Sequence, residues 1–201
     1  MSRFRLPGLT LVTLDVFAFV RPIVYLGKRP DTKAMLRHPE LRTERLLLRD
    51  FLHEDAPAIV RLAGAREVAA TTLRIPHPYT LADAETFFRL RAEATFGYSF
   101  AITLLDSGEL CGAVGLHPDA VHPRAELGYW IGVPYWGHGY ATEAARAART
   151  WGREGAGVPR LISLIAPHNV RSIRVADKLG AAAERTIRTR FGPAVVWVHP
   201  D

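Results

Sequence analysis

The segment Tyr135-Trp136-Gly137-His138-Gly139-Tyr140-Ala141 decides how this chain is interpreted, because it joins a predicted strand to a predicted helix. Two glycines one residue apart let the backbone turn tightly and approach a ligand closely. The first amides of the following helix have no partner within the helix and point outwards at its positive end. The segment therefore predicts an anion site that suits a pyrophosphate.

Spacing excludes two other phosphate loops. Neither Gly-Lys-Ser nor Gly-Lys-Thr follows the glycines, which excludes a P-loop, and the third glycine and downstream acidic residue of a dinucleotide fingerprint are missing. A Gly-X-Gly pair alone also fits an ordinary tight helix start. The elements around the pair must decide between these interpretations.

The residues after the turn predict a crossover. Residues 137–153 carry an alanine-rich stripe at helical spacing, and Leu161–Ile165 is an apolar run typical of a strand buried on both faces. Strand, helix and strand at this spacing predict a βαβ unit with parallel strands. A second helix at Val170–Leu179, its left-handed end at Gly180, and a last hairpin from Ala182–Glu184 and Val195–Val198 complete this half.

The residues before the turn predict an antiparallel meander. Its strands are Tyr98–Leu105, Leu110–Leu116 and Ala125–Ile131, with a hairpin turn at Asp106-Ser107-Gly108-Glu109. Further upstream we predict a strand at Leu41–Arg49, a helix from Asp55 to Leu62 stopped by Gly64, and a helix after the capping box Thr80-Leu81-Ala82-Asp83. Together these elements predict one mixed α/β (α+β) domain.

Composition bounds the function. The 201 residues fit one domain, with the 48% hydrophobic and 23% charged residues of an ordinary globular protein. The net charge of +6 suits nucleic acid, an acidic surface or a polyphosphate, but the arginines are scattered, which argues against nucleic acid. A single cysteine, Cys111, excludes an intrachain disulfide and favours a reducing, cytoplasmic compartment; its apolar neighbours indicate a buried structural thiol.

The N-terminal segment is interpreted separately. Leu6–Leu26 is mostly apolar, but Asp15 and Arg21 interrupt it and no small-residue cleavage site follows, so a signal peptide is not expected. A charge at the bilayer centre costs about 2.5–3.5 kcal/mol, which argues against a spanning helix and against a membrane partner. We expect residues 1–34 to be an extension of unknown role and residues 35–201 to form the domain, with Met35 as an alternative start.

Four motifs carry a resemblance to a known family. They are Leu41-Arg42-Thr43-Glu44-Arg45-Leu46-Leu47-Leu48-Arg49, Glu126-Leu127-Gly128-Tyr129-Trp130-Ile131, Gly137-His138-Gly139-Tyr140-Ala141-Thr142-Glu143-Ala144 and Asn169-Val170-Arg171-Ser172-Ile173-Arg174-Val175-Ala176-Asp177-Lys178-Leu179-Gly180. In this order and spacing they resemble the GNAT superfamily of N-acetyltransferases, in particular the branch of ribosomal-protein alanine acetyltransferases of RimJ/RimL type. The resemblance covers roughly residues 40–185.

The resemblance implies a fold and a co-substrate. The fold is a mixed, mostly antiparallel central sheet, flanked by helices and splayed open between its fourth and fifth strands. Acetyl-CoA would bind there without a metal, its pantetheine arm paired with backbone groups around Ile131 and Val133. Its pyrophosphate would take amides from Gly137, His138, Gly139, Tyr140, Ala141 and Thr142. Trp136 stands where the family usually has Gln or Arg, which removes a side-chain contact worth about 1.5–3 kcal/mol if charged but leaves the amides.

Acetyl transfer also needs a proton for the leaving thiolate. Many family members donate it from a tyrosine seven residues after the motif asparagine, a position that is Ala176 here. The alternative that the resemblance implies is Ser172, three residues after Asn169, although Ser172 also fits an ordinary first-turn helix residue. Asn169 would contact the cofactor, cap the helix, or do both.

Glu126, on the strand that leads into the site, is the candidate base. It also fits a solvated edge carboxylate or an ion-pair partner of Arg124, and Tyr129 is a weaker alternative base. An α-amino group with a pKa of about 7.7–8.0 is roughly one-seventh neutral at pH 7, whereas a lysine is neutral in only a few molecules per ten thousand. A low-pKa amine, which needs the least help from a base, therefore suits this site better than an unperturbed lysine.

The sequence thus predicts transfer of acetyl from acetyl-CoA to a primary amine, by direct attack in a ternary complex. The acceptor would be a peptide or protein N-terminus or a small-molecule amine. The alternative is a catalytically weak acyl-CoA-binding sensor or interaction module of the same fold. A homodimer is compatible with either interpretation.

Overall fold

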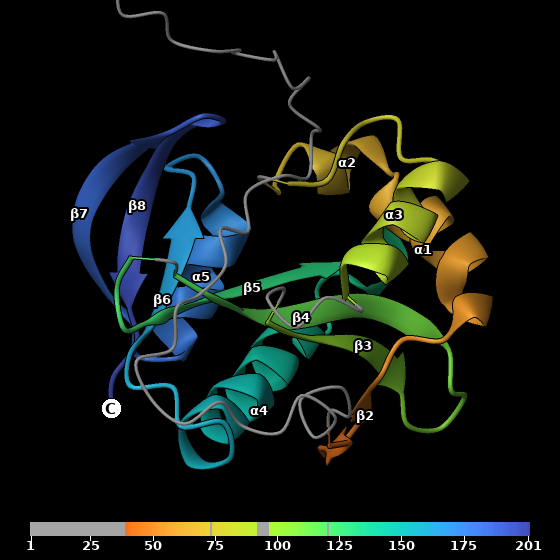
Figure 1. The fold of residues 1–201 in the computed structure, drawn as a ribbon, viewed down its shortest axis with the longest axis horizontal. Helices are drawn as coiled ribbons and strands as arrows, with labels where there is room; N and C mark the ends of the chain where they lie inside the picture. The colour runs from red at the N-terminus through yellow and green to blue at the C-terminus, as the bar shows by residue number, and fades with distance from the viewer. Residues whose placement is uncertain (1–38, 73, 92–96, 120) are drawn as a thin grey trace, which may run out of the picture.

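An eight-stranded mixed sheet runs through the part of the chain that the computed structural model describes, residues 39–72, 74–91, 97–119 and 121–201 (Figure 1). Its strands lie in the order β1-β2-β3-β4-β5-β6-β8-β7. Within these residues, β5 and β6 pair in parallel and the other neighbours are antiparallel. The strands are β1 (Leu41–Arg42), β2 (Leu46–Arg49), β3 (Tyr98–Leu104), β4 (Leu110–Pro118), β5 (Ala125–Ile131), β6 (Leu161–Ile165), β7 (Ala182–Thr189) and β8 (Gly192–Val198).

Helices cover both faces of this sheet (Figure 1). On one face α4 packs its alanine stripe against a core that includes Leu46, Phe100 and Leu127. On the other face α1 and α3 cover a smaller core around Phe51 and Ile59. The helices are η1 (His53–Asp55), α1 (Ala56–Ala63), α2 (Arg66–Ala69), α3 (Leu81–Arg91), η2 (Val133–Tyr135), α4 (Tyr140–Glu154) and α5 (Val170–Lys178). The predicted mixed α/β architecture is confirmed.

The crossover opens the sheet, as predicted. β5 and β6 are in register at two positions, Ala125 with Leu161 and Glu126 with Ile162, and no pair joins them beyond Glu126 in the described residues. From that point the two strands diverge. If the two-residue strand β1 is left out of the count, the opening lies between the fourth and fifth strands.

The prediction of one continuous strand at Leu41–Arg49 is wrong. The chain turns back on itself, so that Leu41 pairs with Leu48 in an antiparallel hairpin. The hydroxyl of Thr43 causes the turn, because it accepts a hydrogen bond from the Leu46 amide at 3.0 Å while the Thr43 amide donates to the Leu46 carbonyl at 2.9 Å. A side chain that competes for backbone groups thus ends β1 early.

The prediction that a helix begins at residue 137 is also wrong, by three residues. Gly137 and Gly139 have φ angles of 84° and 83°, in the left-handed region, so neither can belong to a right-handed helix. α4 therefore begins at Tyr140, with Gly139 as its N-cap residue. The predicted helix at 55–62, the capping box between Thr80 and Asp83, and the left-handed Gly180 are confirmed.

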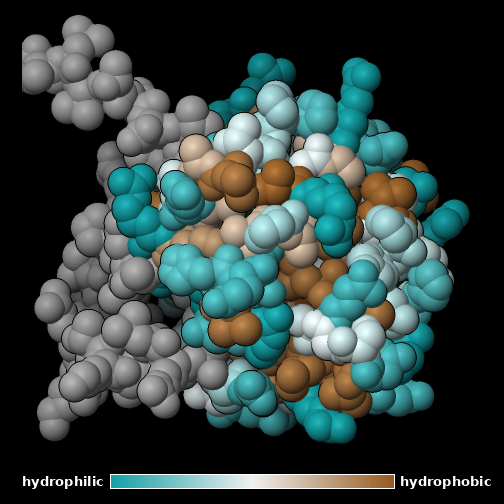
Figure 2. Space-filling model, turned by 90° about the vertical axis from the view of Figure 1, so that its right-hand side faces the viewer, coloured by the Kyte–Doolittle hydropathy of each residue, from teal (hydrophilic) through white to brown (hydrophobic). Residues whose placement is uncertain are grey.

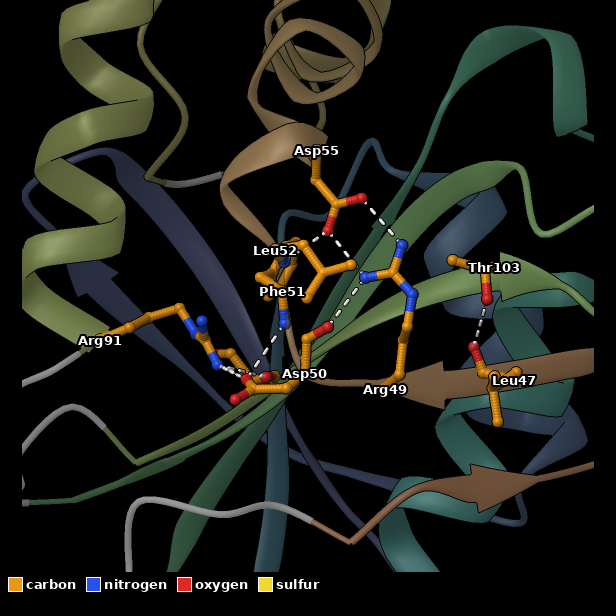
Figure 3. Close-up of polar contacts among 9 residues, drawn as sticks. Leu47, Arg49, Asp50, Phe51, Leu52, Asp55, Arg91 and Thr103 are labelled. Carbon is orange, nitrogen blue, oxygen red and sulfur yellow. Dashed lines mark hydrogen bonds and ion pairs between the residues drawn. The ribbon is translucent and has the colours of Figure 1, made fainter.

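A buried carboxylate fixes the position of α1 above the sheet (Figure 3). The two oxygens of Asp55 each accept a hydrogen bond from the Arg49 guanidinium at 2.8 Å, and one also accepts from the Leu52 amide at 2.8 Å. Burial alone would raise the pKa of Asp55, but these hydrogen bonds outweigh it and hold the pKa below its usual value. A second ion pair, between Asp50 and Arg91, ties the end of α3 to the same segment (Figure 3).

We expect Asp55→Ala to lower the free energy of unfolding by about 3 kcal/mol, because it leaves the half-buried Arg49 guanidinium without its partner. Urea denaturation followed by circular dichroism measures this. The matched control is Asp177→Ala, which removes an exposed carboxylate and should shift stability by less than about 0.5 kcal/mol. Equal losses in the two variants would contradict the structural role of Asp55.

The visible surface gives no sign of one dominant apolar patch. Figure 2 looks onto the side that carries α1 and α3, where apolar and hydrophilic residues are interspersed. Among the described residues, exposed large apolar side chains such as Leu52, just before η1, and Leu81, the first residue of α3, are well separated in the sequence. In the described residues, no helix combines the length and hydropathy needed to cross a bilayer.

The predictions for residues 1–34 and for Met35 lie outside the described residues.

Candidate active site

A cavity of about 470 Å³ occupies the opening between β5 and β6. Glu126 of β5, the predicted base, and Asn169 and Ser172 of α5 all contribute to its lining. Aromatic side chains from the α1–α3 side, including Phe87 and Trp130, complete one wall. The structure thus brings together three residues that lie up to 46 positions apart in the sequence, at the point where the strands part.

Glu126 forms an ion pair, but not with the residue that the sequence suggests. Its partner is Arg74, from the loop after α2, whereas Arg124 pairs with Asp119 at 2.7 Å. Burial would raise the pKa of Asp119, but hydrogen bonds from the Val121 amide, Arg124 and its other neighbours lower it to about 2. Arg124 is therefore engaged by a permanent anion, and the alternative that paired it with Glu126 is corrected.

The first turn of α5 presents one polar side chain to the cavity and uses another for structure. The Asn169 side chain accepts a hydrogen bond from the Ser172 amide at 3.1 Å, as an N-cap does, and donates to the Thr71 carbonyl at 3.0 Å. Asn169 thus caps α5, which was one of its two predicted roles, and its hydrogen bond to Thr71 also ties α5 to the end of α2. Among the described residues, the Ser172 hydroxyl has no hydrogen-bond partner, so it is available to a ligand.

Tyr129 also lines the cavity, from the opposite face of β5 to Glu126, because residues three apart in a strand alternate sides. Its hydroxyl lies 3.5 Å from the Ser172 carbonyl oxygen. Burial raises the pKa of Tyr129 to about 12. The phenol therefore stays protonated at neutral pH and is a donor, which does not support it as a base.

A buried chain of hydrogen bonds holds the closed end of the opening. Ser163 of β6 donates to the Leu127 carbonyl at 2.8 Å and accepts from Nε2 of His199 at 2.9 Å. Leu127 is the first residue of β5 beyond the last pair with β6, so the serine side chain replaces the next bond of the ladder. Sequence patterns do not reveal such a bond, because it joins side chain to backbone across the sheet.

His199 is expected to make stability fall in mild acid. Burial, together with the charges of Arg149 and Arg153, lowers the pKa of His199 to about 4 from 6.5. Because the folded state binds this proton more weakly than the unfolded state, the neutral imidazole contributes full stability above pH 6.5 and loses it as the pH falls from 6.5 towards 4. The loss amounts to about 3 kcal/mol.

Urea denaturation at pH 7.5 and pH 4.5 measures this difference. His199→Gln keeps a polar side chain that cannot titrate, and its stability should decline less than that of the wild type over the same range. Parallel declines in the two proteins would assign the acid sensitivity to carboxylates instead.

The glycine turn at the end of β5 lies at the surface, outside the cavity lining. The first hydrogen bond of α4 runs from the Glu143 amide to the Gly139 carbonyl at 3.1 Å, so the amides of residues 140–142 have no partner within the helix. Among the described residues, no acceptor in the protein takes the amides of residues 137–139 either. The turn thus combines unpaired donors with the positive end of a 15-residue helix.

The base of this turn is clamped by the β1–β2 hairpin, a contact that the sequence did not predict. Glu143 accepts hydrogen bonds from Thr43 at 2.6 Å, from the Arg45 amide at 2.9 Å and from its guanidinium at 2.6 and 2.8 Å. Arg45 also donates to the His138 carbonyl at 3.0 Å. Burial would raise the pKa of Glu143, but these contacts lower it, so the carboxylate stays charged. The positive charge of Arg45 is therefore neutralised by Glu143.

Trp136 forms hydrogen bonds to the backbone carbonyls of Ile131 and Val133, the residues with which the pantetheine arm is predicted to pair. Its indole Nε1 donates to the Ile131 carbonyl at 2.7 Å, and its amide donates to the Val133 carbonyl at 3.2 Å. Each carbonyl oxygen has two lone pairs, so one acceptor position remains on Ile131 and one on Val133. The described residues contain no cluster of His, Cys, Asp and Glu that could hold a metal ion.

Comparisons with known proteins agree with one another. The model of the acetyltransferase (GNAT) domain matches residues 45–182. The chain is 31% identical over 155 residues to the uncharacterized N-acetyltransferase YoaA of Bacillus subtilis, which covers 75% of this chain and 86% of that protein. It spans only 62% of another B. subtilis relative, the uncharacterized protein YkkB, at 35% identity over 106 residues, 50% of this chain.

Solved structures give the same result. An acetyltransferase from Agrobacterium tumefaciens superposes with a TM-score of 0.68 at 31% identity, covering 82% of this chain and 95% of that one. Mycobacterium smegmatis RimJ, solved in complex with CoA-disulfide, has a TM-score of 0.65 at 20% identity, covering 80% and 85%. At 20% identity, the similarity to M. smegmatis RimJ shows a shared fold.

Proposed function

This chain belongs to the GNAT acetyltransferase family, and from that premise we propose that it transfers acetyl from acetyl-CoA to a primary amine in the opening between β5 and β6. One observation carries the proposal. Glu126, Asn169 and Ser172 line a single cavity, and the strand that carries Glu126 leads through η2 into a turn with unpaired amides. A site for an amine and a site for a phosphate thus adjoin one strand.

The glycine turn would hold the co-substrate. The amides of residues 137–142 would donate to the diphosphate, where the α4 dipole adds attraction. The pantetheine arm would run along the backbone at Ile131 and Val133 towards the cavity and use the acceptor positions that Trp136 leaves. The bound CoA-disulfide in M. smegmatis RimJ, a protein of the same fold, supports this class of ligand.

The reaction itself forms one bond and breaks one. The neutral nitrogen of the acceptor attacks the thioester carbon, the C–N bond forms, and the C–S bond breaks to release the CoA thiolate. One proton must leave the nitrogen and one must reach the sulfur. We assign the first transfer to the Glu126 carboxylate and the second to the Ser172 hydroxyl, which has no protein partner among the described residues and would regain its proton from solvent.

The ion pair at Glu126 is consistent with this role. Arg74 places a cation against the carboxylate, and its side chain is 52% exposed, so it leaves at low cost. The ammonium form of an acceptor would replace the guanidinium and lose its first proton to solvent, which gives the neutral nucleophile and leaves the Glu126 carboxylate free to accept the second proton as the C–N bond forms. Because the α-amino group needs the least help to lose its proton, we propose a peptide or protein N-terminus or a small amine of low pKa as the acceptor.

A thiol-release assay tests the proposal. Purified protein is mixed with acetyl-CoA and a panel of N-terminal peptides and small amines, and free CoA thiol is followed with a chromogenic disulfide. Turnover that depends on both the amine and the enzyme is expected. Tight CoA binding without turnover on any acceptor would instead favour an acyl-CoA sensor of the same fold.

A further inference from the structure

An arginine from α5 lies against the glycine turn, and no carboxylate of the described residues pairs with it. The guanidinium carbon of Arg171 is 4.4 Å from the centroid of the Trp136 ring, in cation–π geometry. Trp136 directly precedes Gly137, the first residue of the turn with unpaired amides. The stack therefore joins the two sides of the opening and places a positive charge beside those amides.

The environment of Arg171 distinguishes it from the other arginine at the turn. Arg45 donates two hydrogen bonds from its side chain to Glu143, so its charge is neutralised. Within residues 39–72, 74–91, 97–119 and 121–201, Arg171 forms no ion pair, and its side chain is exposed. A cation that is positioned by a ring but left uncompensated is suited to an anionic ligand.

Trp136 is itself held rigidly enough to act as a platform. Its indole nitrogen donates to the Ile131 carbonyl at 2.7 Å, which fixes the ring relative to β5. A planar guanidinium that stacks on an aromatic face keeps its N–H groups directed outwards in the plane, where they form bidentate bonds to phosphate. The tryptophan thus positions the arginine, and no acceptor in the described part of the chain takes its guanidinium donors.

From this geometry we infer that Arg171 binds the diphosphate of acetyl-CoA and that Trp136 positions it. The inference rests on the proposed function. It also explains how the turn keeps a phosphate-binding cation although residue 136 has no charge: the charge comes from α5, across the opening. The diphosphate, rather than the 3′-phosphate, is the ligand group because the unpaired amides beside the stack are those of the turn.

Isothermal titration with CoA and with dephospho-CoA, which lacks the 3′-phosphate, tests the inference. We expect Arg171→Ala to weaken the binding of both ligands by about tenfold to a hundredfold. Arg171→Gln, which keeps a long planar side chain without charge, should lose nearly as much and serves if the alanine variant folds poorly. The matched control is Arg174→Ala, which removes an exposed arginine one turn further along α5 and should leave both affinities unchanged.

The outcomes separate the two hypotheses. Wild-type protein that does not bind CoA overturns the proposed function. Wild-type binding with an unaffected Arg171→Ala variant overturns only the inference. A loss confined to CoA, with dephospho-CoA unaffected, assigns Arg171 to the 3′-phosphate and overturns the diphosphate assignment. An equal loss of affinity in Arg174→Ala would show that only the overall positive charge matters, and would overturn the inference as well.

A double-mutant cycle tests the role of the platform. If Trp136 acts through Arg171, then Trp136→Leu should weaken binding in the wild-type background and have little further effect in Arg171→Ala. Additive losses would show that Trp136 contributes separately and would overturn its positioning role. Melting temperatures of all variants, measured without ligand, show whether any loss reflects unfolding.

Discussion

Gly139→Asp should abolish acetyl-CoA binding while the protein remains folded. Gly139 has a φ of 83° and is the N-cap residue of α4, so an aspartate there adds a carboxylate beside the amides that are proposed to hold the diphosphate. Its Cβ would lie 3.6 Å from Nη2 of Arg45, a nitrogen that already donates to Glu143. Two like charges about 4 Å apart repel by about 4 kcal/mol near a protein surface, which corresponds to a loss of affinity of several hundredfold. Titration calorimetry with CoA measures the effect.

A second glycine provides the matched control. Gly108 has a φ of 72° in the turn between β3 and β4, and an added Cβ there meets no atom within 4 Å, whereas at Gly139 it meets only Nη2 of Arg45, in ordinary contact at 3.6 Å. Gly108→Asp carries a comparable backbone strain, on the order of 1–2 kcal/mol, at a place remote from the proposed ligand. Normal CoA affinity in Gly139→Asp, or an equal loss in Gly108→Asp, would refute the assignment of the turn.

Glu126→Gln should lower kcat by about a hundredfold or more while acetyl-CoA affinity stays the same, because a positioned general base contributes about 10²–10⁴-fold. The glutamine keeps the size of the side chain but cannot accept a proton from the amine. Stopped-flow or steady-state thiol release with the best acceptor measures kcat, and titration with CoA measures the affinity.

Two further variants distinguish a base from a structural carboxylate. Arg74→Gln removes the other half of the ion pair, and if Glu126 only anchors Arg74, the two variants should have the same small effect. If Glu126 is the base, Arg74→Gln should retain most of kcat. Glu85→Gln, on the exposed side of α3, controls for the loss of one negative charge.

Local patterns predicted most of the fold, because each depended on residues close together in the sequence. The alternation and turn residues of 98–131 gave the meander, and Gly180 gave the end of α5. The errors had local causes too: the Thr43 hydroxyl divided one predicted strand in two, and the left-handed glycines delayed the start of α4. In both cases the sequence contains the residues responsible, but it does not show their hydrogen bonds or dihedral angles.

The contacts that define the site could not be read from the sequence in the same way. Glu126 was a candidate from its motif, yet its partner was expected two residues away and lies instead at Arg74, 52 positions upstream. No spacing rule links the Thr43 and Arg45 hairpin to Glu143, about a hundred residues later. Such pairs form because the sheet order brings distant segments together.

The turn from Trp136 to Glu143 separates what the sequence determines from what the tertiary structure decides. The sequence alone determined that this segment presents unpaired amides at a helix start, because two glycines and the helix dipole are properties of the local chain. The tertiary structure alone decided which side chains surround those amides. It neutralised Arg45 with Glu143 and stacked Arg171 on Trp136, because charge and ring positions depend on how α5 and the β1–β2 hairpin pack around the turn.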